Sequence, residues 1–144
     1  QYIYSDNYTF PLQCNDWVIS YTLCCRNNAI TNLQNPGNFN IYAQATMSNM
    51  NNMCNNSPIF TTRPVPFVCA GQVFNYNHGA VDIDGDSLAY SLVNPLDGPG
   101  LNIPHRSPFT PTNPLSTNGG FNFNIGTGQM NFNPNASQQA VVSV

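Results

Sequence analysis

The sequence predicts an all-β fold, and three observations support this prediction. Several stretches alternate hydrophobic and polar residues with a period of two, as half-buried strands do. Turn-forming residues separate these stretches, with 10 Gly and 12 Pro in 144 residues and many Asn. Lys and Glu, two common helix formers, are absent. These features favour short strands joined by turns over helices.

The charge content is low and excludes some classes of partner. Charged residues make up only 6% of the chain, and the formal net charge is −3. Because three Arg and no Lys cannot form a surface that follows phosphates, we expect no nucleic-acid binding. No hydrophobic run approaches the roughly 18 residues that span a bilayer, so we expect no membrane insertion. The 41% of hydrophobic residues argues against a disordered chain.

Two strong strand patterns stand in the first part of the chain. Residues 17–24 place Trp17, Ile19, Tyr21 and Leu23 on one face, and we expect this aromatic face to be buried. Residues 39–47 alternate in the same way, and residues 1–10 do so more loosely. The polar stretch 48–58 then predicts a boundary between an N-terminal β module, 1–55, and a second module, 56–144.

The second module contains shorter strand patterns and one long loop. Residues 94–120 are rich in Pro and Gly, and a loop of this length usually carries function or is ordered by a partner. Both chain ends fall in strand-like sequence, so we expect the first module and the last strand to be incomplete. Strands are predicted at 59–62, 73–77, 88–93, 121–125, 129–132 and 139–144.

The five cysteines predict disulfides rather than a metal site. No C-x-x-C spacing is present, and disulfides suit an extracellular chain. Cys54 and Cys69 flank the entry to the second module, and closing their loop of about 15 residues would contribute roughly 3 kcal/mol. Cys14 can bridge to either Cys24 or Cys25 across a bend, and we take Cys14 and Cys25 as the second pair.

The acidic loop at 82–86 holds half of the six acidic residues of the chain. Asp82, Asp84 and Asp86 stand at alternate positions, with Gly85 between the last two. Carboxylates this close repel one another, and Ca2+ is the cation that accepts several oxygen ligands from a flexible loop. We therefore expect Ca2+ as a cofactor. The alternative is a solvated turn whose Asp side chains bond their own backbone.

The string Gly85-Asp86-Ser87-Leu88 also resembles the nucleophile block of a hydrolase family. A serine nucleophile needs a base, which that family supplies from a late Asp-x-x-His. Neither His78 nor His105 follows an Asp by three positions. We therefore expect no enzymatic activity.

The order of motifs in the second module resembles a cadherin-like domain of bacterial surface proteins. The motifs are Asn56-Ser57-Pro58-Ile59-Phe60, Gly71-Gln72-Val73-Phe74, Ala80-Val81-Asp82-Ile83-Asp84-Gly85-Asp86 through Leu92, and Thr127-Gly128-Gln129-Met130-Asn131-Phe132. With Trp17 and the run Ser20 to Asn27, the chain resembles long Bacteroidetes surface proteins of the gliding-motility adhesin kind, which are substrates of type IX secretion.

This resemblance implies Ig-like or cadherin-like antiparallel β-sandwich modules on the bacterial cell surface, with a role in adhesion or in a filament. It implies a Ca2+ site formed by Asp82, Asp84 and Asp86, with Asn56 from the linker. The expected partners are neighbouring modules or copies of the chain. The alternative function is a lectin-like module that binds surface glycans through the 94–120 loop.

Overall fold

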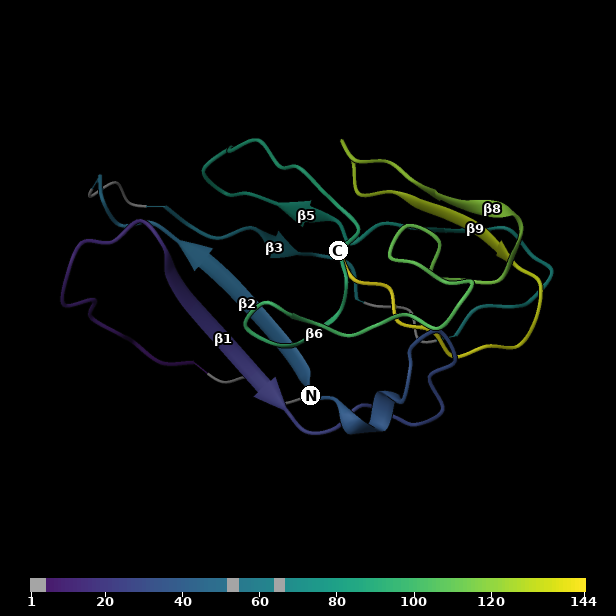
Figure 1. The fold of residues 1–144 in the computed structure, drawn as a ribbon. Helices are drawn as coiled ribbons and strands as arrows, with labels where there is room; N and C mark the ends of the chain where they lie inside the picture. Colours follow the sequence, from purple (N-terminus) through teal and green to yellow (C-terminus); the bar gives the residue numbers. More distant parts are fainter. Residues whose placement is uncertain (1–4, 52–54, 64–66) are drawn as a thin grey trace.

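The computed structural model describes residues 5–51, 55–63 and 67–144. The described residues form strands, turns and one short 3-10 helix, which confirms the all-β class. All strand pairs are antiparallel and fall into three sheets. Figure 1 shows the long β1–β2 hairpin on one side of the molecule and the β8–β9 hairpin on the other.

The first sheet has the order β1-β2-β6-β7. Strands β1 (Trp17–Leu23) and β2 (Ile41–Met47) pair along seven residues, with Ser20 opposite Gln44. The 3-10 helix η1 (Pro36–Asn38) lies in the connection between them. The sheet is completed by β6 (Leu96–Gly98) and β7 (Leu101–Asn102), and Tyr42 of β2 pairs with Leu96 of β6.

The second sheet has the order β4-β9-β8, formed by β4 (Phe74–Tyr76), β9 (Met130–Pro134) and β8 (Thr117–Phe123). Strands β4 and β9 and the last three residues of β8 alternate large hydrophobic residues with Asn, so one face is aromatic and the other carries amides. Phe132 lies between Phe74 and Phe121, with ring centroids 5.7 and 5.4 Å away. On the opposite face, Asn131 Nδ2 donates to Asn75 Oδ1 at 2.5 Å.

The two-stranded sheet pairs β3 (Ile59–Phe60) with β5 (Ala80–Val81). This pairing brings the entry of the second module beside the start of the acidic loop. The backbone amide of Thr61 also donates to the carbonyl of Gly79 at 3.1 Å. The short sheet thus positions Asn56 and the acidic loop close to one another.

The core is small and joins both predicted modules. The buried side chain of Asn32 donates to the carbonyl oxygens of Pro114 and Val141 at 3.0 and 2.8 Å, and Oδ1 accepts from Val141 N–H at 3.0 Å. Leu33 beside it is fully buried and pairs with His105. The buried hydrophobic residues are Leu33, Tyr42, Ile103, Leu115 and Met130.

These contacts correct the predicted division of the chain at residue 55. The first sheet takes β1 and β2 from 1–55 and β6 and β7 from 56–144. Asn32 likewise bonds to two segments of the second part. The two parts therefore share one sheet and one core. Composition alone marked the polar stretch 48–58 as a boundary, but it cannot report pairing between distant segments.

Most predicted strands are present, and three are not. The patterns at 17–24, 39–47, 73–77 and 121–132 are confirmed by β1, β2, β4 and the β8–β9 hairpin. Residues 88–93, the described residues 5–10 and 139–144 form no strand. Within 88–93, Tyr90 N–H donates to Ile125 and Val93 N–H donates to Ser143, so the segment divides its bonds between two partners. An alternating pattern forms a ladder only where one partner strand runs alongside it.

Candidate functional site

The β1–β2 hairpin is the most unusual surface of the molecule. Its strand sequences, WVISYTL and IYAQATM, contain no charged residue. Ile19 and Tyr21 on one face are 55% and 56% exposed, and Val18 on the other face is 52% exposed. The prediction that the aromatic face is buried was therefore wrong for this chain, because no described segment covers it along Ile19 to Leu23. We call the two strands together the hairpin sheet.

The outer edge of the hairpin sheet is also free. Strand β1 is the first in the order β1-β2-β6-β7, so among the described residues it pairs on one side only. Edge strands are usually protected by Lys, Pro, a bulge or a covering segment. The seven residues of β1 contain no Lys and no Pro, and their register with β2 is continuous. The edge therefore presents unpaired backbone groups beside hydrophobic side chains.

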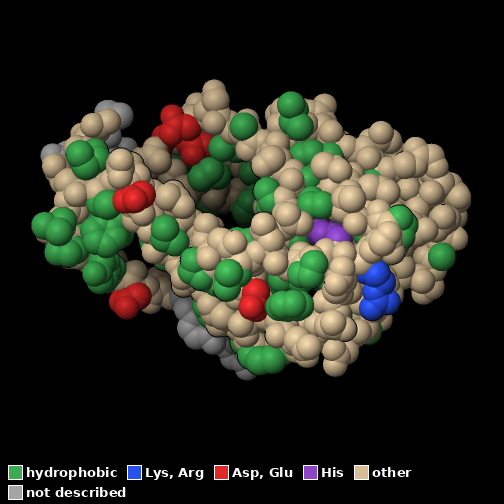
Figure 2. All heavy atoms as spheres, viewed as in Figure 1, with side chains coloured by type: hydrophobic (Ala, Val, Ile, Leu, Met, Phe, Trp, Pro, Cys, Tyr) green, Lys and Arg blue, Asp and Glu red, His purple; other side chains and the backbone are tan. Residues whose placement is uncertain are grey.

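The accessible surface of the whole chain is larger than that of a typical folded monomer of this length. It measures 10243 Å², whereas a folded monomer of this length exposes roughly 7,300 Å². Figure 2 shows hydrophobic side chains at the surface at the end of the molecule that holds β1 and the preceding loop. Large hydrophobic side chains that gather at the surface in this way mark an interaction surface.

Both ends of the hairpin sheet are anchored. At one end, Cys14 N–H donates to Asn49 Oδ1 at 2.6 Å and Asn49 N–H donates back to the Cys14 carbonyl at 3.0 Å. At the other end, the guanidinium of Arg26 donates to the carbonyl of Leu96 at 3.1 Å. Burial lowers the pKa of Arg26, and the carboxylate of Asp97 opposes this shift. These contacts hold the sheet in one position although both faces of β1 are exposed from Val18 to Leu23.

The cysteines do not pair as expected in the described residues. The sulfur atoms of Cys24 and Cys25 lie within disulfide-bonding distance of each other, whereas Cys14 is a free thiol whose Sγ donates to Asp16. The proposed Cys14–Cys25 bond is therefore not formed. The physical reason is that the extended strand β1, about 20 Å long at about 3.3 Å per residue, lies between the two positions and keeps them apart.

The other predicted pair cannot be assessed in the same way. Cys54 lies outside the described residues, so its pairing with Cys69 stays a prediction. Cys69 itself is exposed.

The acidic loop brings two of the four predicted ligands together. Asn56 N–H donates to Asp84 Oδ2 at 2.6 Å, and Asn56 Nδ2 lies 3.1 and 3.2 Å from the two carboxylate oxygens. Asp82 Oδ1 accepts from the backbone N–H groups of Asp84 and Asp86 at 2.9 and 3.2 Å. Gly85 has φ +82°, which its lack of a side chain permits. The loop is thus closed by hydrogen bonds.

This arrangement does not fit a Ca2+ site as it stands. A Ca2+ ion needs several oxygen atoms converging on one point. Asp84 instead meets the donor groups of Asn56, and Asp82 turns an oxygen to the loop backbone. In the described part of the chain, no group of three acidic, His or Cys residues gathers to hold a metal. Ca2+ binding therefore stays a prediction of the sequence pattern.

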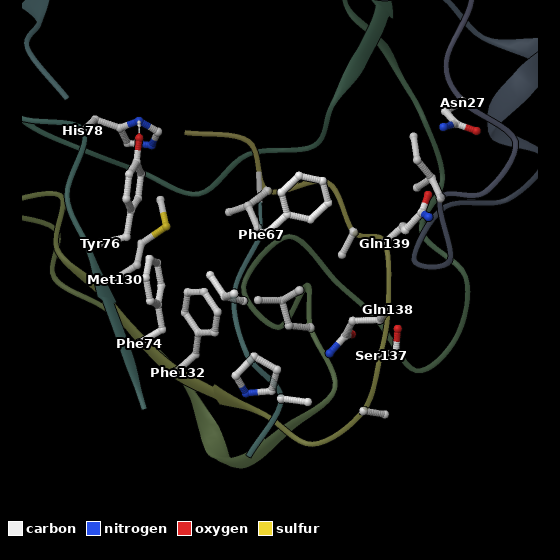
Figure 3. A pocket seen from close by; sticks show the side chains of 18 residues that line it. Asn27, Phe67, Phe74, Tyr76, His78, Met130, Phe132, Ser137, Gln138 and Gln139 are labelled. Atoms are coloured by element: carbon white, nitrogen blue, oxygen red, sulfur yellow. Dashed lines mark hydrogen bonds between the residues drawn. The ribbon is translucent and has the colours of Figure 1, made fainter. Parts of the chain in front are cut away.

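A pocket of about 840 Å³ lies over the aromatic face of the second sheet. Figure 3 shows Phe74 and Tyr76 of β4 and Met130 and Phe132 of β9 along one side, with Ser137, Gln138 and Gln139 opposite. The Tyr76 hydroxyl lies 3.3 Å from Nδ1 of His78, and burial lowers the pKa of His78. Burial thus favours the neutral form of the imidazole, and the surrounding side chains are mostly hydrophobic.

The predicted 94–120 loop is more ordered than its composition indicated. It contains β6, β7 and the first residues of β8, and Ile103 and Pro114 within it are fully buried. Gln34 N–H donates to the carbonyl of Pro104, and Arg106 N–H donates to that of Asn32, both at 3.0 Å. The segment is thus fixed by residues 31–34. Glycan binding by this segment stays a prediction.

Sequence reasoning missed the residues that hold these segments together. Asn32 and Asn49 each join parts of the chain that are far apart in sequence, but Asn is frequent throughout and serves mostly in turns. No spacing or neighbouring residue distinguishes these two from the others. A buried amide of this kind becomes visible only once its backbone partners are placed.

Comparisons of the chain with protein-family models, curated proteins and solved structures give no match. The resemblance to cadherin-like surface modules therefore depends on the motifs of the sequence alone. Within the described residues, no helix has the length and hydrophobicity needed to cross a bilayer.

Proposed function

We propose that the chain is a structural module of an extracellular bacterial surface protein or filament, and that its hairpin sheet binds a neighbouring module or another copy. The observation that carries the proposal is the hairpin sheet itself, which has no charged residue in 14 strand positions and whose strand β1 is exposed on both faces from Val18 to Leu23. Such a surface is costly to leave in water and is stabilised by a partner.

The anchoring of the hairpin sheet supports the same function. A strand that associates with a partner must keep its backbone in place before the partner arrives, because ordering it on binding would lower the affinity. The bonds of Cys14 with Asn49 at one end and of Arg26 with Leu96 at the other provide this order. The sheet also continues into β6 and β7, so a load on β1 is transmitted to the core.

Composition supports an extracellular location. The chain has five Cys, and several cysteines in one small chain suit an oxidising compartment. It has few ionisable groups and many turn-forming residues, as expected of a module whose role is mechanical rather than catalytic.

Hydroxyl-radical footprinting tests the proposal. The side chains of Ile19, Tyr21 and Leu23 should be oxidised in the dilute isolated chain and protected in the assembled surface protein. Ile83 and Ile125, which are 77% and 73% exposed and lie away from the hairpin sheet, provide the control and should react equally in both states. Equal oxidation of Tyr21 in both states would reject the proposal.

A further inference from the structure

We propose that β1 pairs antiparallel with β1 of a second copy of this chain, about a two-fold axis that passes beside Ser20. This inference rests on the proposed function, and it names the partner and the register of the contact. The pairing joins two four-stranded sheets into one continuous sheet, with the two β1 strands at its centre. It uses the free edge of β1, which a second strand can extend by main-chain hydrogen bonds.

The sequence of β1 is complementary to itself in this register. In an antiparallel pair, residues directly opposite each other point to the same face, so a two-fold axis places one residue opposite its own copy. Of all such registers, only the one centred on Ser20 pairs all seven residues of Trp17–Leu23. Ile19 then lies opposite Tyr21 of the second copy, and Val18 lies opposite Thr22.

These cross-strand pairs are favourable ones. Aromatic side chains opposite β-branched side chains stabilise antiparallel sheets, and β-branched pairs pack well on the pleated surface. Trp17 lies opposite Leu23 of the second copy at each end of the contact. The aromatic face of one copy thus continues into the aromatic face of the other, whereas a slip by one residue would join unlike faces.

Charge and exposure agree with a second copy as the occupant. Neither β1 nor β2 contains a charged residue, so two copies meet without like-charge repulsion. Val18, Ile19, Tyr21 and Leu23 are each about half exposed in the single chain, and a second copy paired along β1 covers part of this hydrophobic surface.

The test uses three variants of the full chain and sedimentation equilibrium. Ser20→Lys places two ammonium groups directly opposite each other across the two-fold axis, which should weaken the dimer by about tenfold or more. Gln44→Lys is the matched control, because Gln44 lies opposite Ser20 on β2, is exposed and is away from the edge. Gln44→Lys should dimerise as the wild type does.

A mixture of oppositely charged variants distinguishes a lost β1–β1 contact from a loss of folding. Ser20→Asp alone should also weaken the dimer, whereas an equimolar mixture of Ser20→Asp and Ser20→Lys should restore it, because opposite charges then meet at the axis. A general loss of folding in the variants would not be rescued by mixing. Circular dichroism of each variant checks that its strands are retained.

The outcomes distinguish this inference from the proposed function. A wild-type dimer that Ser20→Lys leaves intact, or a mixture that fails to restore association, overturns the β1–β1 register. A wild-type chain that stays monomeric at all concentrations overturns the second copy as the partner. In both cases, protection of Tyr21 from hydroxyl radicals in the assembled protein would still support the proposed function, with a different module as the partner.

Discussion

Asn32 and Val141 bond each other twice, although 109 positions separate them in the chain: the side-chain amide of Asn32 donates to the Val141 carbonyl at 2.8 Å, and its Oδ1 accepts from Val141 N–H at 3.0 Å. A third bond joins Asn32 to the carbonyl of Pro114 at 3.0 Å. One fully buried amide thus satisfies backbone groups of two other segments. In a small core, these hydrogen bonds fix the positions of the three segments, which hydrophobic contact alone would not do.

Replacing this amide should be among the most destabilising single changes in the chain. Asn32→Ala removes three hydrogen bonds and leaves backbone groups of buried Pro114 and part-buried Val141 without partners, which should lower the free energy of unfolding by about 3 kcal/mol. Urea denaturation followed by Trp17 fluorescence measures the change. Asn118→Ala, at an exposed position on β8, is the control and should change stability by no more than about 0.5 kcal/mol. Equal stabilities for the two variants would contradict this role of Asn32.

The bonds between Asn56 and Asp84 should hold the entry segment against the acidic loop. Asn56→Ala removes the side-chain donor while the backbone N–H remains, so we expect a loss of at most about 1 kcal/mol because the pair is exposed. The local effect should be larger, and amide hydrogen exchange at Ile59 and Val81 should accelerate as the β3–β5 pair opens more often. Unchanged exchange at these two amides would show that the pair does not hold the segment.

Calcium can be tested at the same loop. Because Asp84 already accepts hydrogen bonds from Asn56, we expect EGTA to leave the Tm of the wild-type chain unchanged. Thermal unfolding with EGTA and with added Ca2+ measures this. A Tm that rises with Ca2+ in the wild type, and not in Asp84→Asn, would instead establish the Ca2+ site that the sequence pattern predicts.

Two histidines should make the chain less stable in mild acid. Burial lowers the pKa of both His78 and His105 below the ordinary value of 6.5. The unfolded chain therefore binds protons more readily than the folded chain. The free energy of unfolding keeps its full histidine contribution above about pH 6.5, and this contribution is lost as the pH drops through the lowered pKa values of the folded chain. We expect the Tm to fall between about pH 7 and pH 5. The double variant His78→Gln and His105→Gln should reduce this fall in Tm. If the dependence of Tm on pH is the same in the double variant, groups other than these histidines cause the fall.

The sequence predicted those parts of the fold that depend on local pattern. The alternation of WVISYTL and IYAQATM was sufficient to place β1 and β2, and the pattern around Gly126 to Gly128 was sufficient to place the β8–β9 hairpin. Asn56 contacts Asp84 of the acidic loop as a hydrogen-bond donor, and the Ca2+ site that the sequence pattern placed there stays a prediction. In each case, the signal lies within one segment or in a known order of motifs.

The predictions that were wrong required information about distant segments. The alternation in β1 indicates a strand but not whether its aromatic face is covered, because the covering group belongs to another element or another molecule. Cys14 and Cys25 are close in sequence, yet the extended strand between them keeps them apart. The boundary at residue 55 was drawn from composition, whereas the pairing of Tyr42 with Leu96 crosses it.

Hydrogen–deuterium exchange of the β1 amides tests the central claim most directly. The claim is that the free edge of the hairpin sheet is a binding surface. In the assembled protein, about half of the amides of Trp17–Leu23, those that point away from β2, should exchange much more slowly than in the dilute chain. The amides of β9, which lies between β4 and β8 and pairs with both, should not change. Equal exchange of the outward β1 amides in both states would contradict the claim.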